Sequence, residues 1–210
     1  MNEFLKYIAN RKPGLMGINE YFVSAVLLPI LEIEEQKSIL FEIRSEHLDR
    51  QPGEICFPGG KVEEGETPRE TAVRETSEEL GISPGSIDIL GPLDILVAPL
   101  GTVIYPYIGV INQPGNITPD PGEVAGTFTV PLQFFLENPP SRAKGEVAIR
   151  YGEQFPLEKA PPGYGPGWKK RWEFSVYYYQ YDNYFIWGMT SKILVNFVNI
   201  IKNTSPEKIY

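Results

Sequence analysis

The sequence predicts an α/β protein in which helices cover a mixed β-sheet. Apolar runs typical of strands recur along the chain and are interleaved with two or three segments of helical pattern. A helix with clear boundary signals is expected at residues 67–80, and an amphipathic helix at residues 189–201. No shift in composition divides the chain. We therefore expect one domain over residues 1–210, with the helices at 2–9 and 189–201 packed on it.

After the short helix at residues 2–9, the first half of the chain predicts a β-hairpin. Residues 21–31 and 38–44 are rich in apolar and β-branched residues and flank a polar turn at 34–37. The Pro-Gly-Gly sequence at residues 58–60 breaks regular structure before the next helix.

The helix at residues 67–80 is defined at both ends. Thr67 is the expected N-cap, Pro68 takes the first helical position, and Glu70 completes a capping box. Gly81 follows the last helical residue and predicts the helix end.

The second half of the chain predicts further strands and a loop. Strands are expected at 87–97, 103–111, 124–130 and 172–181, a short helix at 132–137, and a long Gly/Pro-rich loop at 156–168. The closing helix at 189–201 places its apolar residues on one stripe, which is consistent with packing on a sheet.

The composition excludes several function classes. Acidic residues outnumber basic ones 27 to 19, and the net charge of −8 argues against a nucleic-acid or membrane partner bound through a basic surface. No apolar run approaches the roughly 20 residues of a membrane-spanning helix. The first residues lack signal-peptide features, residues 208–210 are not a Ser-Lys-Leu address, and the single cysteine suits a reducing compartment. We therefore expect a cytoplasmic protein.

Three carboxylates crowd one face of the helix at 67–80. At about 100° per residue, Glu75, Glu78 and Glu79 share an arc of about 100°, and like charges at this spacing destabilise a helix. A solvated acidic face is one interpretation. A bound divalent cation would instead convert the repulsion into ligation, and an all-carboxylate set favours Mg²⁺ or Mn²⁺ over zinc.

The frame around these acids resembles the box of the Nudix hydrolases, G-x5-E-x7-R-E-U-x-E-E-x-G-U, in which U is a bulky apolar residue. The match covers residues 60–82 and fills every fixed position, including Gly60, Glu66 and Arg74. Thr76 stands where Leu, Ile or Val is usual, although its methyl group can still face the core. The resemblance implies the Nudix fold, an α/β/α sandwich around a mixed β-sheet, and hydrolysis of a nucleoside diphosphate linked to another group.

The same resemblance implies roles for individual residues. Glu75 and Glu79 would ligate the essential divalent metal, with Glu78 close by and a backbone carbonyl at Gly60 contributing. Arg74 would orient the carboxylates by reaching the glutamate at position 66 or 70.

Pyrophosphate hydrolysis also needs a general base for the attacking water. The candidates are a box glutamate that the metal does not saturate, Glu78, and a loop acid, Glu123, which can equally be a simple turn residue.

Residues 40–60 resemble the signature L-L-T-x-R-S/A-x3-R-x3-G-x3-F-P-G-G that precedes the box in coenzyme A pyrophosphatases, and further matches extend the resemblance over about residues 20–200. Two positions depart from it. Glu42 replaces the usual Thr, and Asp49 replaces the second Arg, with Arg50 displaced by one residue. The resemblance implies cleavage of coenzyme A or its acyl esters to 3′,5′-ADP and (acyl-)4′-phosphopantetheine.

Arg44, Arg50 and Lys61 are the basic residues near the box that could meet phosphates of a small nucleotide substrate. The two departures leave open a Nudix hydrolase of another nucleoside diphosphate derivative, such as ADP-ribose, a dinucleotide or a nucleoside triphosphate. The intact box argues against a non-catalytic nucleotide-binding module. The oligomeric state stays open, a homodimer included.

Three other features have ordinary structural interpretations. His47 fits a polar loop residue, and Cys56 fits a small buried residue beside Phe57 rather than a nucleophile. The aromatic residues of the strand at 172–181 fit core packing. Alternatively, this strand and the loop at 156–168 form a wall of the adenine or pantetheine site.

Overall fold

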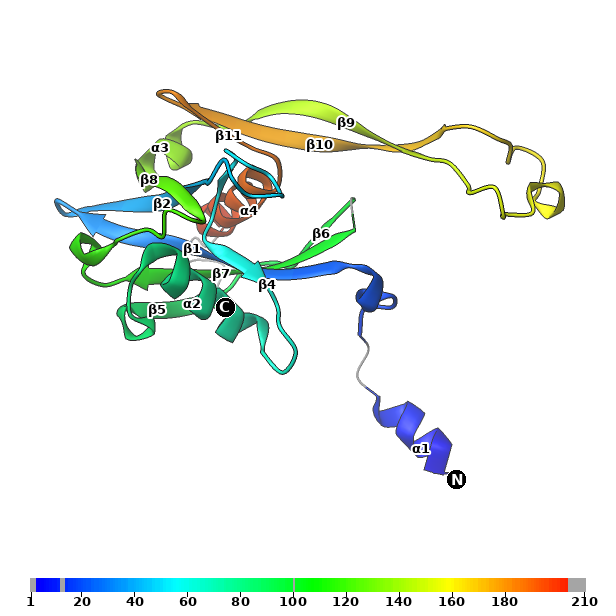
Figure 1. Ribbon diagram of the computed structural model, residues 1–210, viewed down its shortest axis with the longest axis horizontal. Helices are drawn as coiled ribbons and strands as arrows, with labels where there is room; N and C mark the ends of the chain where they lie inside the picture. The colour runs from blue at the N-terminus through cyan, green and yellow to red at the C-terminus, as the bar shows by residue number, and fades with distance from the viewer. Residues whose placement is uncertain (1–2, 12–13, 100, 204–210) are drawn as a thin grey trace.

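An eight-stranded mixed sheet forms the centre of the molecule, seen in a computed structural model that describes residues 3–11, 14–99 and 101–203 (Figure 1). Its main strand order is β3-β2-β1-β7-β5, with β4 on β1, β6 on β7 and β8 on β2. The strands are β1 (Phe22–Ile33), β2 (Gln36–Arg44), β3 (Ile55–Cys56), β4 (Gly59–Lys61), β5 (Ile87–Pro92), β6 (Leu96–Ala98), β7 (Thr102–Ile111) and β8 (Val124–Pro131). β1 and β7 run parallel, whereas the other pairs are antiparallel, and the predicted hairpin is formed by β1 and β2.

Helices cover both faces of this sheet, as expected. On β1, Leu27 and Leu31 point to the face covered by α2 (Pro68–Leu80), where they pack with Leu80. Leu28 and Ile30 point to the opposite face, which is covered by α3 (Leu132–Glu137) and α4 (Gly188–Asn203). Because β1 buries side chains on both faces, its sequence is a nearly continuous apolar run. The predicted α/β/α sandwich is confirmed.

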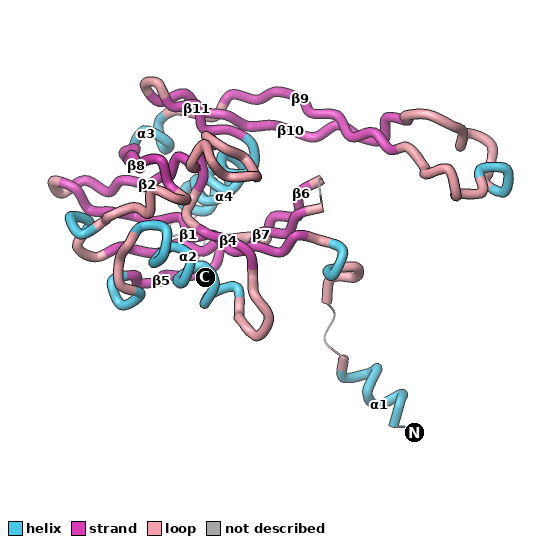
Figure 2. The backbone as a smooth tube through the Cα atoms, in the orientation of Figure 1, coloured by secondary structure: helices cyan, strands magenta, loops and turns pink. Residues whose placement is uncertain are grey.

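A second, three-stranded sheet lies against the α4 side, in the order β11-β10-β9. It consists of β9 (Ser141–Ile149), β10 (Lys169–Tyr181) and β11 (Tyr184–Trp187). β9 and β10 form a long ribbon that extends away from the body of the molecule (Figures 1 and 2). We did not predict β9 or β11. The residues of β9 are largely exposed, so its sequence lacks the apolar alternation that marks a half-buried strand.

The two terminal helices differ in their packing. α4 buries Ile193, Leu194 and Phe197 against the sheet, as predicted. α1 (Glu3–Asn10) forms where a helix was expected, although residue 2 lies outside the described residues. α1 has no buried residue and stands away from the sheet in Figure 1, so the expected packing of this helix on the domain is not observed.

The boundaries of α2 agree with the sequence signals. Thr67 and Glu70 form the reciprocal capping box, and Gly81 ends the helix in the left-handed conformation, with φ of 61°. Thr76 is fully buried and its hydroxyl donates to the Ala72 carbonyl at 2.6 Å, so a threonine fits this core position.

Another prediction needs correction. The strand expected at 87–97 is divided into β5 and β6, because Pro92 cannot donate a backbone hydrogen bond and the chain turns after it. Among the described residues, no helix is long and apolar enough to cross a membrane.

Candidate active site

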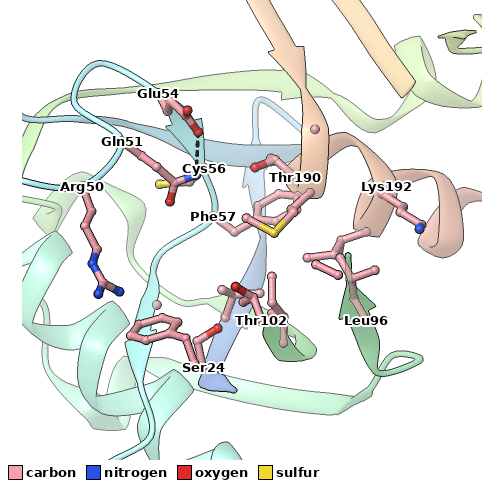
Figure 3. Close-up of a pocket in the computed structure, with 18 of the residues that line it drawn as sticks. Ser24, Arg50, Gln51, Glu54, Cys56, Phe57, Leu96, Thr102, Thr190 and Lys192 are labelled. Carbon is pink, nitrogen blue, oxygen red and sulfur yellow. Dashed lines mark hydrogen bonds between the residues drawn. The ribbon is translucent and has the colours of Figure 1, made fainter. Parts of the chain in front are cut away.

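A cavity of about 800 Å³ opens between the sheet, α2, α4 and the inner end of β10. Figure 3 shows Arg50 from the loop after β2, Phe57, Leu96 of β6 and Thr190 of α4 arranged around it. The Thr190 hydroxyl donates to the Ile55 carbonyl at 3.0 Å and fixes the start of α4 against β3. This volume is typical of a site for a small-molecule ligand.

Most of the residues that the sequence marked as functional meet in this cavity. They are Arg44, Arg50, Gly60, Lys61, Glu75, Glu79 and Glu123. Two others, Glu78 and Arg74, do not line it. The Glu78 side chain is 61% exposed and pairs with Arg74 on the outer side of α2 at 3.1 Å. The structure therefore separates Glu78 from Glu75 and Glu79, which the helical arc had grouped together.

Strand β4 brings backbone atoms to the carboxylates. The Gly59 N–H donates to Glu79 Oε2 at 2.7 Å. Gly59 has φ of 150°, and a Cβ there would lie 2.6 Å from the Val26 Cα of β1. A Cβ on Gly60 would overlap the Glu75 carboxylate. Because they lack side chains, the two glycines let β4 approach α2 and β1 more closely than other residues would. The sequence predicted only a break in regular structure here, whereas residues 59–61 form a strand.

Glu79 is unusual for a helical glutamate because it is only 3% exposed. Burial raises its pKa to about 8, against the lowering effect of the Gly59 hydrogen bond, and the negative charges of Glu75 and Glu123 raise it further. Burial is also the main cause that raises the pKa of Glu75. Burial and mutual repulsion thus disfavour the charged forms of these neighbouring acids in the cavity.

Arg74 holds the neighbouring acids in place from outside the cavity. Its guanidinium donates to Glu66 at 2.7 and 3.0 Å and contacts Glu75 at 2.9 Å. Glu66 is one of the two partners expected, whereas Glu70 serves the N-cap of α2 instead. The hydrogen bond from Arg74 is the main cause that lowers the pKa of Glu66 to about 2.

The donor set suits a hard divalent cation. Glu75 and Glu79 offer carboxylate oxygens beside the backbone of β4, and a cation would relieve the repulsion that raises the pKa of Glu79. Within residues 3–11, 14–99 and 101–203, no three acidic, histidine or cysteine side chains are already gathered as a ligand cage. Mg²⁺ is commonly held by one or two carboxylates and completed by water and substrate phosphates, so this arrangement fits it.

Basic residues surround the acidic end. Arg44 donates through Nε to the Arg50 carbonyl at 3.3 Å, and the Arg50 guanidinium lies 5.0 Å from the Phe22 ring centroid. Lys61 extends from β4. Asp49 does not line the cavity, whereas Arg50, one residue later than the arginine of the signature, does.

The rest of the cavity wall is largely apolar. It comes from β6, β10, β11 and α4, including Leu96, Val176, Trp187, Met189 and Ile193. These residues lie far from the box in the sequence, and only the topology brings them to it. The aromatic strand contributes to both the cavity wall and the core: Phe174 lines the cavity and Tyr179 is buried in the core, whereas the loop at 156–168 contributes nothing to the wall.

Glu123, His47 and Cys56 differ in their positions relative to the cavity. The loop of Glu123 is held at the end of β2 because the Ser45 N–H donates to the Glu123 carbonyl at 2.8 Å. His47 is exposed and outside the cavity. Cys56 lines it, and burial raises the pKa of its thiol well above the usual value, which disfavours the thiolate that a nucleophile requires.

Glu42 is a buried acid near the site that was not predicted as a site residue. Glu42 in β2 is 1% exposed and acts electrostatically on Glu79. An acid within the apolar run of a central strand was the available signal, but it was read only as a departure from the family signature.

Comparison with known proteins agrees with this geometry. Residues 22–150 match the profile described as NUDIX domain. The chain is 30% identical over 189 residues to the mouse peroxisomal coenzyme A diphosphatase NUDT7, covering 87% of this chain and 71% of that protein. It is 38% identical over 107 residues to the Caenorhabditis elegans peroxisomal coenzyme A diphosphatase ndx-8, covering 50% of this chain and 46% of that protein.

A solved structure supports the fold. The MutT/nudix family protein from Enterococcus faecalis aligns over 95% of this chain and 69% of its own, with a TM-score of 0.51 and 15% identity. At this identity the similarity concerns the fold alone.

Proposed function

Since the chain belongs to the Nudix hydrolase family, we propose that it hydrolyses the pyrophosphate bond of coenzyme A or acyl-coenzyme A. The products are 3′,5′-ADP and (acyl-)4′-phosphopantetheine. The observation that carries the proposal is a single cavity with carboxylates and arginines at one end and an apolar wall at the other. Such a cavity suits a substrate that joins a highly charged nucleotide to a long, weakly polar chain.

Glu75 and Glu79 would hold the divalent cation, Mg²⁺ or Mn²⁺, together with the backbone carbonyl of Gly60. Their burial beside β4 supports this assignment, whereas Glu78, paired with Arg74 at the surface, has less support. When bound, the cation neutralises charge on the phosphoryl oxygens and makes a coordinated water more acidic. Arg74 positions Glu75 and does not itself contact substrate.

Glu123 is the better candidate for the general base. It lines the cavity with Glu75 and Glu79 and lies on a loop fixed to the end of β2. Glu78, the other candidate, points outward to Arg74. A base must come within hydrogen-bond reach of the attacking water, which favours a residue inside the cavity.

The phosphates of the substrate would bind to Arg44, Arg50 and Lys61. All three line the cavity, and the Arg50 guanidinium lies over Phe22 and donates no hydrogen bond to the part of the chain that the structure describes. Arginine forks match phosphate oxygens geometrically, so the two arginines fix the orientation of the nucleotide. The apolar wall from β6 to α4 would then receive the pantetheine arm and an acyl group.

A second candidate is hydrolysis of another nucleoside diphosphate derivative, such as ADP-ribose, a dinucleotide or a nucleoside triphosphate. Glu42 and Asp49, which depart from the coenzyme A signature, are the observations that favour it.

A substrate panel tests both candidates. The purified protein is incubated with coenzyme A, acetyl-coenzyme A, ADP-ribose, diadenosine polyphosphate or ATP, each with Mg²⁺, Mn²⁺ or a chelator, and products are identified by mass spectrometry. We expect 3′,5′-ADP and 4′-phosphopantetheine from coenzyme A, and no turnover with the chelator. Turnover of ADP-ribose without 3′,5′-ADP from coenzyme A would establish the second candidate. Binding of nucleotide without any hydrolysis would establish a non-catalytic module.

The cytoplasmic location expected from the composition stays a prediction. Imaging of the tagged protein in its own cells tests it.

A further inference from the structure

Glu42 lies near the end of strand β2, at a buried position where a charged side chain is costly. It is 1% exposed, and its Oε1 has no hydrogen-bond partner among the described residues. Removing a carboxylate from water without a hydrogen-bond partner is unfavourable, and such groups are rare in folded proteins. Packing alone does not account for this residue, because Leu40, its neighbour on the same face of the strand, is a buried apolar residue.

The strand register places the Glu42 side chain on the same face of the sheet as Cys56. Glu42 pairs with Cys56 of β3 and with Thr127 of β8. Side chains at paired positions of a sheet lie on the same face, and Cys56 lines the cavity. Phe41, one residue earlier, points to the opposite face and stacks on Phe57 at 5.1 Å. Leu40, two residues before Glu42 on the same face of the strand, packs with Leu80 of α2. Glu42 therefore lies on the sheet face that α2 covers, although it does not itself line the cavity.

The charges around Glu42 are those of the acidic end of the cavity. The strongest charge acting on it is that of Glu79, followed by Arg44 and Glu123. Arg44 is the one positive charge of this group, and no ion pair within 4.0 Å joins it to Glu42 among the described residues. Glu42 is thus a buried acid that adjoins other acids and has an unused oxygen.

We propose that Glu42 is a further carboxylate of the cation site, whose free Oε1 binds the divalent cation of Glu75 and Glu79, directly or through one water. This inference rests on the proposed function, since it requires a cation at that site. It adds a ligand from a strand outside the box, at a position where the coenzyme A pyrophosphatase signature has Thr. A cation would also supply the partner that the buried oxygen lacks.

Direct binding of Mn²⁺ tests this role without substrate. Titration calorimetry measures the Mn²⁺ affinity of the full chain and of the variants Glu42→Gln and Glu42→Thr. A matched control, Glu32→Gln, removes one exposed carboxylate from the neighbouring strand β1. We expect Mn²⁺ affinity to fall at least about tenfold in both Glu42 variants, as removal of a charged ligand predicts, and to stay unchanged in the control.

Thermal unfolding with and without Mn²⁺ gives a second readout, because the effect of Glu42→Gln on the unfolding temperature should differ between the two conditions. Without metal, Glu42→Gln should unfold at the same or a higher temperature than the unchanged protein, because a buried unpaired charge has been removed. With saturating Mn²⁺, the stabilisation should be smaller than in the unchanged protein. A folded Glu42→Gln protein with unchanged Mn²⁺ affinity overturns the proposal, and if that variant does not fold, Glu42→Thr decides in the same way.

The same titrations separate this inference from the proposed function. If the unchanged protein binds no Mn²⁺, both the cation site and the role of Glu42 fail. If Mn²⁺ binds and depends on Glu79 but not on Glu42, only the present inference fails. If Mn²⁺ affinity depends on Glu42 but coenzyme A gives no products, the proposed substrate is wrong and the proposed cation site stands.

Discussion

The two glutamates at the acidic end of the cavity are held by different forces. Glu79 is buried and accepts a hydrogen bond from the Gly59 N–H, which fixes one of its oxygens. Glu75 is turned by an ion pair with Arg74. Glu79 is thus positioned by a backbone group and Glu75 by a side chain.

Substitution of Glu79 should therefore separate catalysis from stability. We expect Glu79→Gln to lower kcat for coenzyme A by about two to three orders of magnitude, as loss of charge stabilisation at the reacting phosphates predicts. The melting temperature without metal should not fall, because burial penalises the charged carboxylate. Steady-state kinetics and calorimetry check both parts. Glu64→Gln, which changes an exposed acid of the same loop and helix region, should behave like the unchanged protein.

Two adjacent residues distinguish a substrate contact from a surface charge. Arg50 lines the cavity and Asp49 does not. We expect Arg50→Ala to raise KM for coenzyme A about 10- to 100-fold with little effect on kcat, since a charged hydrogen bond to phosphate contributes about 1.5–3 kcal/mol. Asp49→Ala should leave KM unchanged. Equal effects of the two substitutions would remove Arg50 from the phosphate site.

At the scale of elements, the site depends on how closely β4 approaches its neighbours. Gly59 meets the β1 backbone, whereas Gly60 meets only the flexible end of Glu75. The contact of Gly59 is therefore required for folding, whereas the contact of Gly60 determines where the Glu75 carboxylate can lie.

Alanine substitutions at the two glycines should have opposite effects. Gly59→Ala should lower the melting temperature markedly, because backbone must move and φ of 150° disfavours a side chain. Gly60→Ala should keep the melting temperature near that of the unchanged protein but lose most activity, because the Glu75 carboxylate is displaced. Gly91→Ala, at a position with open space, is the control for both measurements. A stable and fully active Gly60→Ala protein would contradict the assigned role of Glu75.

The loop before α2 is joined to the helix by the pair of Glu66 and Arg74, and its effect depends on pH. The pKa of Glu66 is lowered from 4.5 to about 2, chiefly by the hydrogen bond from Arg74. A carboxyl group whose pKa falls on folding stabilises the fold above its unfolded pKa and loses that contribution as pH falls through its folded pKa.

We therefore expect Glu66→Gln to be less stable than the unchanged protein at pH 7, with the difference closing between about pH 4.5 and pH 2. Urea unfolding at a series of pH values measures it. Glu64→Gln serves as the comparison, because it removes an exposed carboxylate that has no hydrogen-bond partner among the described residues. A constant difference at all pH values would mean that the loss comes from packing rather than from the charge of Glu66.

For the molecule as a whole, the sequence was informative where local signals and tertiary packing agree. The capping box of α2, the β1–β2 hairpin and the stripe of α4 were predicted because each has a strong periodicity or boundary signal. Of the box residues, Gly60, Glu75 and Glu79 line the cavity, whereas Arg74 and Glu78 of the same helix lie outside it. The exposed ribbon strand β9 and the apolar wall were missed, because exposed strands lack a pattern and the wall is assembled from distant segments.

The ribbon of β9 and β10 permits a test of which parts of the molecule the site needs. No residue from 141 to 178 is buried, and residues 150–168 contribute nothing to the cavity wall. Ile149 and Lys169 face each other across the ribbon, so an Asn-Gly turn can replace residues 150–168 without changing the strand register.

We expect this replacement to shift the melting temperature by less than about 4 °C, because surface changes cost little, and to change kcat/KM for coenzyme A by less than about threefold. Phe174→Ala in the full chain is the contrasting variant, because its ring lines the cavity, and it should raise KM. Kinetics with coenzyme A and acyl-coenzyme A compare the two proteins. Loss of activity in the shortened ribbon would mean that the loop at 150–168 closes over the substrate, and the wall of the site would then have to include it.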